Sequence, residues 1–246
     1  ALFLALVMVG AVLPGCGDGS KDPGGQGNNG GEAVSGGEIT VGNVFCIGRN
    51  YAAHAVELGN AIETEEPMVF LKPTSSVLKV GEPLRLPAWS QDVHHEAELV
   101  LLIGRDARDI GPERALSVVA GYGIGLDLTA RDVQAQAKQK GHPWTKSKGF
   151  PGAACISDFV PADDVAGASR FRFSLTVNGT VRQSGDTDLM LFPLPVLVSY
   201  LSRQYGLSAG DMIYTGTPAG VGPLQAGDCL LLTLDGLIEA RFKVTE

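Results

Sequence analysis

Two glycine-containing dipeptides, Asn178-Gly179 and Asp235-Gly236, constrain the fold of this chain more than any other feature. Each dipeptide lies between two stretches rich in apolar and β-branched residues, a pattern typical of a two-residue type I′ turn between antiparallel strands. The sequence therefore predicts two β-hairpins. Their strands are expected at residues 170–177 with 180–183 and at residues 230–234 with 237–244.

Other short apolar stretches predict a domain in which strands outnumber helices. Further strands are expected at residues 44–47, 68–72, 96–103 and 121–128. Helices are expected at residues 52–58, 113–119, 131–140 and 195–205. Thr129 and Asp132 have the spacing of a capping box for the third helix. Because strands and helices do not alternate regularly, the predicted fold class is α+β with mostly antiparallel strands, and not a doubly wound sheet.

The first residues of the chain differ in composition from the rest. Residues 1–13 are apolar and uncharged, which is typical of the core of a secretory signal and too short to span a bilayer comfortably. Leu13-Pro14-Gly15-Cys16 follows and resembles a bacterial lipobox, whose cysteine is lipidated. We expect residues 1–16 to be a truncated lipoprotein-like signal segment. The alternative is a buried N-terminal helix or strand.

Residues 17–37 are rich in Gly, Asn and Ser and cannot bury enough apolar surface to order themselves. They are expected to form a disordered tether between this signal segment and a domain at residues 38–246. The arrangement predicts an exported protein that is attached to a membrane through a lipid on Cys16. The alternative is a cytoplasmic enzyme preceded by a misassigned start.

Charge and cysteine content exclude several classes of function. The formal net charge is −8, and no run of Lys and Arg could follow a phosphate backbone, so nucleic acid is not an expected partner. The four cysteines form no Cys-x-x-Cys pair, so neither a zinc site nor a disulfide framework is expected. Cys46 and Cys155 lie in apolar surroundings and are expected to be buried.

Three carboxylates are candidate metal ligands. Glu96 and Glu98 lie two residues apart in a predicted strand, so their side chains point to the same face. Two carboxylates that close repel each other unless a cation or a proton neutralises them, and Mg²⁺ or Mn²⁺ would do so. The alternative is an exposed strand face with two solvated glutamates. Asp127 ends an apolar strand and is a candidate third ligand; its alternative role is an ordinary turn or capping aspartate.

His54 and Glu57 have the spacing of a catalytic pair. Residues three apart share one face of a helix and can form a hydrogen bond. A histidine oriented by a carboxylate can act as a general base near neutral pH. The spacing alone agrees equally well with a surface pair on an amphipathic helix.

Residues 215–222 (TGTPAGVG) form a glycine-rich segment with two threonines. The segment lacks the Gly-Lys-Ser/Thr ending of a phosphate-binding loop. Its amides and hydroxyls could still donate to a small anion, whereas the alternative is a plain turn between strands.

Six motifs together resemble the fumarylacetoacetate hydrolase family. They are GRNYAAH (48–54), FLKP (70–73), HHEAEL (94–99), DLTARDVQ (127–134), PWTKSKGF (143–150) and TGTPAGVG (215–222). The resemblance covers about residues 44–244 and is closest to the single-domain acylpyruvases, whose relatives include oxaloacetate decarboxylases and tautomerases. It implies a β-rich mixed-sheet roll, usually in a homodimer.

The resemblance also implies roles for individual residues. Glu96, Glu98 and Asp127 match the family's Mg²⁺ or Mn²⁺ ligands. His54 and Glu57 match a pair that activates water on a mobile lid. The remaining matches are Lys148, which would reach a substrate oxygen, and four substrate-binding positions at Arg49, Arg131, Gln134 and Thr217.

Several neighbours of these residues leave alternatives open. Lys146 competes with Lys148, because both would point to one face if this segment is extended. Helix solvation is the alternative role for Arg131 and Gln134. The histidines at 94, 95 and 142 are expected to support the site and not to bind metal.

The sequence therefore predicts a metal-dependent hydrolase that cleaves a C–C bond in acylpyruvate-type β-diketo acids and releases a 2-oxo acid. The alternatives within the same fold are an oxaloacetate decarboxylase and a 2-oxo acid tautomerase or isomerase. A more distant alternative is a non-catalytic exported protein that binds small acids. Retention of both His54 and Glu57 argues against this last alternative.

Overall fold

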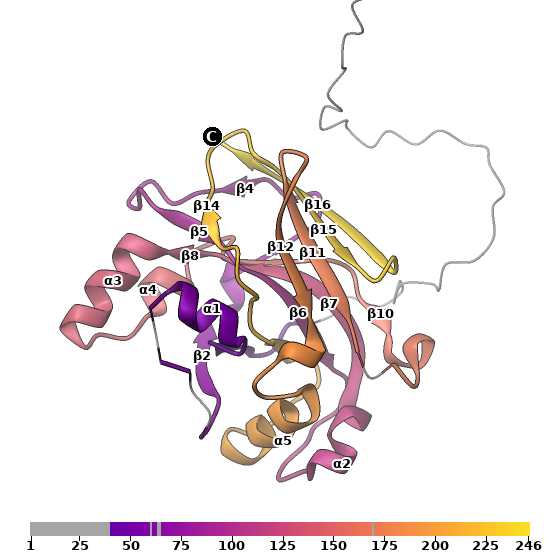
Figure 1. The fold of residues 1–246 in the computed structure, drawn as a ribbon. Helices are drawn as coiled ribbons and strands as arrows, with labels where there is room; N and C mark the ends of the chain where they lie inside the picture. The colour runs from indigo at the N-terminus through magenta and orange to yellow at the C-terminus, as the bar shows by residue number, and fades with distance from the viewer. Residues whose placement is uncertain (1–39, 60, 63–64, 169) are drawn as a thin grey trace, which may run out of the picture.

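The computed structural model describes residues 40–59, 61–62, 65–168 and 170–246, and β-sheets dominate it (Figure 1). The largest sheet is mixed, because β1 pairs with β13 and β3 with β9 in parallel while its other pairs are antiparallel. Its strand order is β2 (Met68–Lys72), β1 (Val44–Gly48), β13 (Met212–Tyr214), β6 (Ala97–Ile103), β7 (Val119–Asp127), β9 (Ala154–Ile156) and β3 (Val77–Lys79), with β10 (Val160–Pro161) paired to β7.

A second sheet contains both predicted hairpins. Its order is β12 (Thr180–Asp186), β11 (Arg172–Val177), β15 (Cys229–Leu234), β16 (Ile238–Thr245) and β4 (Leu84–Arg85). Asn178 and Gly179 have φ values of 51° and 79°, and Asp235 and Gly236 have 44° and 73°. Positive φ at both central residues is the requirement of a type I′ turn, so the hairpin predictions are confirmed.

The smaller elements complete an α+β fold, as predicted. A three-stranded sheet consists of β14 (Gly222–Pro223), β5 (Val93–His95) and β8 (Thr129–Ala130). The α-helices are α1 (Ala52–Glu57), α2 (Pro112–Ala115), α3 (Arg131–Lys140), α4 (Thr145–Lys148) and α5 (Leu194–Gln204). The sequence predicted four of these helices and missed α4, which is a single turn.

The predicted capping box at α3 is wrong. Ala130 is the N-cap residue, and no side chain caps this end. The Thr129 hydroxyl donates instead to the carbonyl oxygen of Asp127 at 3.2 Å. Asp132 accepts hydrogen bonds from the Ser90 hydroxyl at 2.7 Å and from the Val133 amide at 2.8 Å. The bond from Ser90 ties α3 to the loop before β5.

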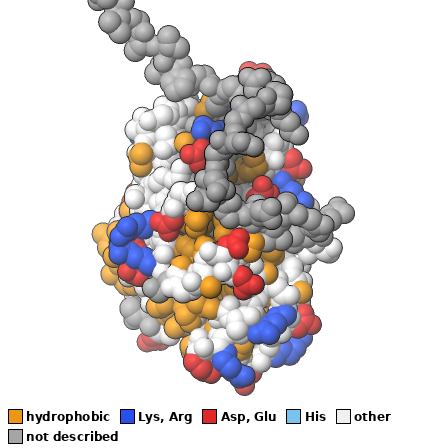
Figure 2. Space-filling model, turned by 90° about the vertical axis from the view of Figure 1, so that its right-hand side faces the viewer, with side chains coloured by type: hydrophobic (Ala, Val, Ile, Leu, Met, Phe, Trp, Pro, Cys, Tyr) orange, Lys and Arg blue, Asp and Glu red, His pale blue; other side chains and the backbone are white. Residues whose placement is uncertain are grey.

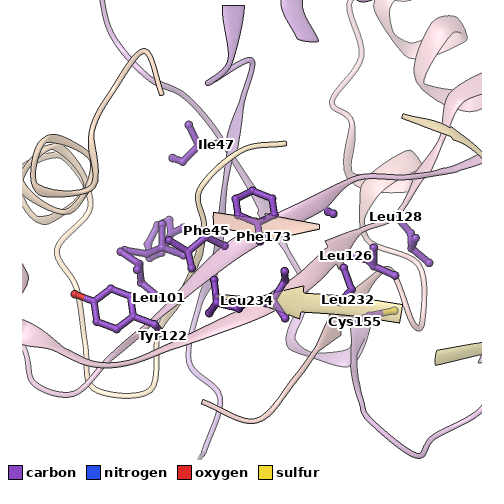
Figure 3. Close-up of a cluster of buried hydrophobic side chains, with 14 of the residues drawn as sticks. Phe45, Ile47, Leu101, Tyr122, Leu126, Leu128, Cys155, Phe173, Leu232 and Leu234 are labelled. Atoms are coloured by element: carbon purple, nitrogen blue, oxygen red, sulfur yellow. The ribbon is translucent and has the colours of Figure 1, made fainter. Parts of the chain in front are cut away.

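The main core lies between the two larger sheets. Figure 3 shows Phe173 and Leu232 of the second sheet near Leu101 and Leu126 of the first, and all four belong to one buried cluster. Full burial of a Leu or Phe side chain contributes about 1.5–3 kcal/mol, so this cluster holds the sheets together. Cys46 and Cys155 are buried free thiols, as expected.

The lipidation at Cys16, the signal segment at 1–16 and the tether at 17–37 fall outside the described residues. Among the helices that are described, none has the length and apolar character needed to cross a membrane. Figure 2 shows one face of the molecule, on which hydrophobic side chains gather between charged ones. The homodimer implied by the resemblance stays a prediction.

Candidate active site

Three acidic residues meet where β5, β6 and β7 come together. Glu98 lies in β6, Glu96 directly precedes that strand, and Asp127 ends β7. The β6–β7 register places Ala97 opposite Leu126, and the Asp127 amide donates to the Glu96 carbonyl oxygen at 2.8 Å. One ligand atom from each carboxylate lies within 4.8 Å of the others, and all three residues are buried. We call Glu96, Glu98 and Asp127 the carboxylate cluster.

Three cations surround the carboxylate cluster. Lys148 donates to Glu96 at 2.7 Å and to Asp127 at 2.6 Å. The Nζ of Lys72 lies 2.7 Å from Asp127 Oδ1, and Arg131 forms an ion pair with Glu96. Charges at such depth need partners, and these cations provide them for two of the three carboxylates.

The two glutamates of the cluster therefore differ in their electrostatics. Burial alone would raise the pKa of Glu96, but the charges of Lys148 and Arg131 outweigh it and hold this pKa well below its usual value. Burial raises the pKa of Glu98 well above its usual value, and the negative charges of Asp127 and Glu96 add to that shift. Glu98 thus favours its protonated form unless a further cation is present.

The donor chemistry of the cluster fits a hard divalent cation. All three side chains offer carboxylate oxygens, which are the ligands that Mg²⁺ and Mn²⁺ prefer. The Oδ1 atom of Asp127 is buried without a hydrogen bond, although it forms an ion pair with Lys72. A cation at this point would satisfy Asp127 and remove the repulsion that disfavours ionised Glu98.

His54 lies on α1 and lines the same pocket as the carboxylate cluster. Its Nδ1 is 3.4 Å from Glu57 Oε2, and Glu57 also accepts a hydrogen bond of 3.0 Å from the Gly220 amide. Because His54 is buried, its pKa is lowered from the usual value. The alternative of a surface pair therefore does not describe His54, whose buried imidazole favours the neutral form at the pocket.

The short helix α4 separates the two candidate lysines. Lys148 is buried beside the carboxylate cluster, whereas Lys146 is exposed and lies over the Trp89 ring at 5.3 Å from its centroid. The premise of an extended segment is wrong, because one helical turn points these side chains in different directions. The structure thus brings Lys148 and not Lys146 to the site.

The predicted substrate-binding residues also converge on this pocket. Arg131 donates to the Gln134 side chain at 2.9 Å as well as pairing with Glu96, so Arg131 is more than a solvated helix residue. The pocket is lined by Arg49, Arg131, Gln134 and Thr217, together with Phe70, Lys138 and Trp144. Contact between these residues and a substrate stays a prediction.

Two of the three histidines outside α1 hold structure around the site. His94 pairs with Asp92 at 2.8 Å, and His95 contacts the Gln183 side chain at 2.9 Å. The third, His142, lines a separate surface groove beside β2. None of them belongs to the carboxylate cluster.

Sequence reasoning did not single out Lys72, Lys138 or Gln183. The signal for Lys72 was present, since it ends an apolar strand and lies within the FLKP motif. A buried lysine at such a position requires an anion, here Asp127. Nothing in the local pattern around Gln183 indicates that its side chain reaches another sheet.

Comparison with known proteins gives a family and several relatives of this chain. The family model described as fumarylacetoacetate (FAA) hydrolase C-terminal matches residues 43–245. An oxaloacetate tautomerase of Escherichia coli (strain K12) is 45% identical over 188 residues, which cover 76% of this chain and 85% of the relative. A mitochondrial oxaloacetate decarboxylase of Dictyostelium discoideum is 45% identical over 190 residues, covering 77% and 87%.

A solved structure with the same fold is that of a hydrolase. The fumarylpyruvate hydrolase of Pseudomonas aeruginosa, described in complex with Mn²⁺ and pyruvate, is 38% identical and has a TM-score of 0.81. The match covers 89% of this chain and 98% of that protein. With a family model that spans nearly the whole described domain, the chain belongs to the fumarylacetoacetate hydrolase family.

Proposed function

We propose that this protein is a Mg²⁺- or Mn²⁺-dependent oxaloacetate tautomerase, which interconverts the keto and enol forms of a 2-oxo dicarboxylic acid. The observation that carries the proposal is the position of His54 and the carboxylate cluster in one pocket. This geometry joins a base to a cation site, and relatives at 45% and 41% identity are named oxaloacetate tautomerases. The proposal replaces C–C hydrolysis as the leading reaction.

The chain's residues can perform this reaction by moving one proton. Unprotonated His54 would take a proton from C3 of the keto acid while Glu57 orients the imidazole. The electron pair of the broken C–H bond moves to the C2 oxygen, and the buried Lys148 ammonium can stabilise the charge there. Return of the proton to that oxygen gives the enol, with no atom gained or lost. A divalent cation held by the carboxylate cluster would polarise the 2-oxo group.

Two other reactions have support of their own. Cleavage of a C–C bond in an acylpyruvate would use His54 to activate water, and the likeness to fumarylpyruvate hydrolase favours it. Decarboxylation of oxaloacetate requires the cation and Lys148 but no attacking water, and the Dictyostelium relative carries that name. Non-catalytic acid binding explains neither the burial of His54 nor its partner Glu57.

A direct test compares three substrates with one preparation of the full chain. Enol-oxaloacetate is mixed with enzyme and Mg²⁺, and the loss of enol absorbance is followed before any pyruvate forms. We expect fast, chelator-sensitive ketonisation, with slower release of pyruvate from oxaloacetate and from acetylpyruvate. If pyruvate release from acetylpyruvate is the fastest reaction, the protein is a hydrolase and the proposal is wrong.

Assembly and location remain proposals that rest on the sequence alone. We propose a homodimer from family resemblance, and size-exclusion chromatography with light scattering tests it. We propose export and attachment through Cys16 from the lipobox-like sequence. Membrane fractionation of Cys16→Ser beside the unmodified chain tests that attachment, and equal soluble fractions would contradict it.

A further inference from the structure

The side chain of Gln183 links the second sheet to the candidate active site. Gln183 lies on β12 and is 1% exposed. Its Oε1 accepts hydrogen bonds from the Ala97 amide at 3.0 Å and from His95 Nδ1 at 2.9 Å. Its Nε2 donates to the Thr217 hydroxyl at 2.7 Å and to the Pro218 carbonyl oxygen at 2.9 Å. All four hydrogen-bonding positions of this buried amide are therefore used.

The chemistry of these partners fixes the orientation of the amide. The Ala97 amide can only donate and the Pro218 carbonyl can only accept, so Oε1 and Nε2 cannot be exchanged. Since Oε1 is an acceptor, His95 must carry a proton on Nδ1. Gln183 thus sets the tautomer of His95 as well as the position of the segment at 217–218.

The hydroxyl of Thr217 uses its only hydrogen within the same set of contacts. It accepts from Gln183 and donates to the Ala97 carbonyl oxygen at 2.9 Å. Its single hydrogen is therefore not available to a substrate. The Thr217 amide has no hydrogen-bond acceptor among the residues that the structure describes, which leaves it as the donor that this pocket residue can offer to an anion.

The segment at residues 215–220, which we call the TGTPAG loop, contacts both parts of the site. The Gly216 amide donates to Glu98 at 2.7 Å, and the Gly220 amide donates to Glu57 at 3.0 Å. Gly220 has φ +97°, and an added Cβ would collide with the carbonyl oxygen of Arg182, the neighbour of Gln183. The β12 strand therefore supports this loop by backbone contact as well as through the Gln183 amide.

We propose that Gln183 is a positioning residue that holds the TGTPAG loop, so that one side chain of the second sheet sets both substrate affinity and metal affinity. It acts through Thr217 on substrate binding and through Gly216 on Glu98. The effect of Gln183 on substrate affinity rests on the proposed function, whereas its effect on metal affinity does not.

Two substitutions at this position separate the hydrogen bonds. Gln183→Glu keeps the shape and both accepted bonds but, as a carboxylate, loses both donations, to the Thr217 hydroxyl and to the Pro218 carbonyl oxygen. Gln183→Met removes all four. We expect the KM for oxaloacetate and the Kd for Mn²⁺ to rise about tenfold in both, a change typical of an outer-shell substitution, while kcat falls less. The KM of Gln183→Glu should approach the wild-type KM as the pH is lowered, because a protonated carboxyl can donate a hydrogen bond again. The KM of Gln183→Met should not approach it.

Controls distinguish positioning from a loss of stability. Ser174→Ala removes the 2.8 Å hydroxyl contact with Thr233 in the same sheet and should leave KM and the Mn²⁺ Kd within twofold of wild type. If the Gln183 variants do not fold, Thr217→Val breaks the same contact from the loop side and should raise both constants. KM and Kd near wild-type values in these variants, with only a lower Tm, would overturn the proposal. Absence of wild-type activity on oxaloacetate would overturn the proposed function instead, and the Mn²⁺ Kd would still decide the role of Gln183.

Discussion

Lys148 donates a hydrogen bond of 2.6 Å to Asp127, and both side chains are buried. The same ammonium also contacts Glu96, so it places a positive charge between two candidate metal ligands. A divalent cation bound by the carboxylate cluster would therefore experience repulsion from Lys148. The charge of Lys148 would therefore favour catalysis and weaken metal binding.

We predict that Lys148→Met lowers kcat by about 10²-fold or more but strengthens Mg²⁺ binding. The substitution removes a group that can stabilise enolate charge, and it also removes the competing cation. Loss of one partner from a buried ion pair should destabilise the metal-free protein by about 3–5 kcal/mol. Titration calorimetry and melting curves with and without Mg²⁺ measure these effects. The exposed Lys146→Met is the matched control, and weaker Mg²⁺ binding in Lys148→Met would contradict the prediction.

Metal binding should release a proton from Glu98. Burial and two neighbouring carboxylates raise the pKa of Glu98, so a larger fraction is protonated at neutral pH and must ionise before it can bind a cation. Mg²⁺ affinity is therefore expected to increase as the pH rises. Calorimetry in two buffers with different ionisation enthalpies detects the released proton.

Glu96 provides the comparison for that experiment. Its pKa is held below the usual value, so it is ionised already and has no proton to release. Glu98→Gln should lose both affinity and proton release. Glu96→Gln should lose affinity but keep much of the proton release, because burial, the largest cause of the Glu98 pKa shift, remains. Equal binding enthalpies in the two buffers for the unmodified protein would refute the assignment to Glu98.

His54 should determine the acidic limb of the pH–activity profile. Because burial lowers its pKa, the base remains unprotonated below pH 6.5, and kcat/KM should fall only at lower pH. His54→Ala is expected to reduce tautomerisation by about 10²–10⁴-fold, and Glu57→Gln by a similar or smaller factor. Decarboxylation needs no proton removed from C3 by His54 and should survive better. Equal losses in both reactions, or a weaker Mg²⁺ affinity in His54→Ala, would assign this helix a structural role.

Much of this arrangement could be predicted because its signals are local. The hairpins follow from Asn-Gly and Asp-Gly, and the proximity of Glu96 to Glu98 follows from the two-residue period of a strand. The residues that join these elements in space leave little signal in the local sequence. Gln183 lies 34 positions from Thr217 along the chain and reaches it only because two sheets pack together.

The helix α4 is a second feature that the sequence did not predict. Trp144 to Gly149 contains neither a long apolar period nor a side-chain cap, so its single helical turn leaves no clear pattern. The turn forms because tertiary contacts, such as that of Lys148 with Asp127, stabilise it. Its absence from the prediction is why Lys146 and Lys148 could not be separated on residue pattern alone.

Lys138 can be used to test whether the pocket prefers a dicarboxylate to a monocarboxylate. It lines the pocket together with Arg49, and neither cation forms an ion pair within the described part of the chain. Two cations without an acidic partner at a pocket favour a ligand with a second negative charge. Oxaloacetate carries two carboxylates, whereas pyruvate carries one.

Lys138→Met should therefore raise the KM for oxaloacetate about fivefold, a modest factor because this residue is exposed to solvent. The inhibition constant of pyruvate should change less than twofold, and the salt dependence of kcat/KM should weaken. Lys140→Met changes an exposed lysine at the end of the same helix and should leave all three quantities unchanged. Steady-state kinetics at two salt concentrations measures them. If the KM for oxaloacetate and the inhibition constant of pyruvate rise by the same factor, Lys138 does not recognise the second carboxylate.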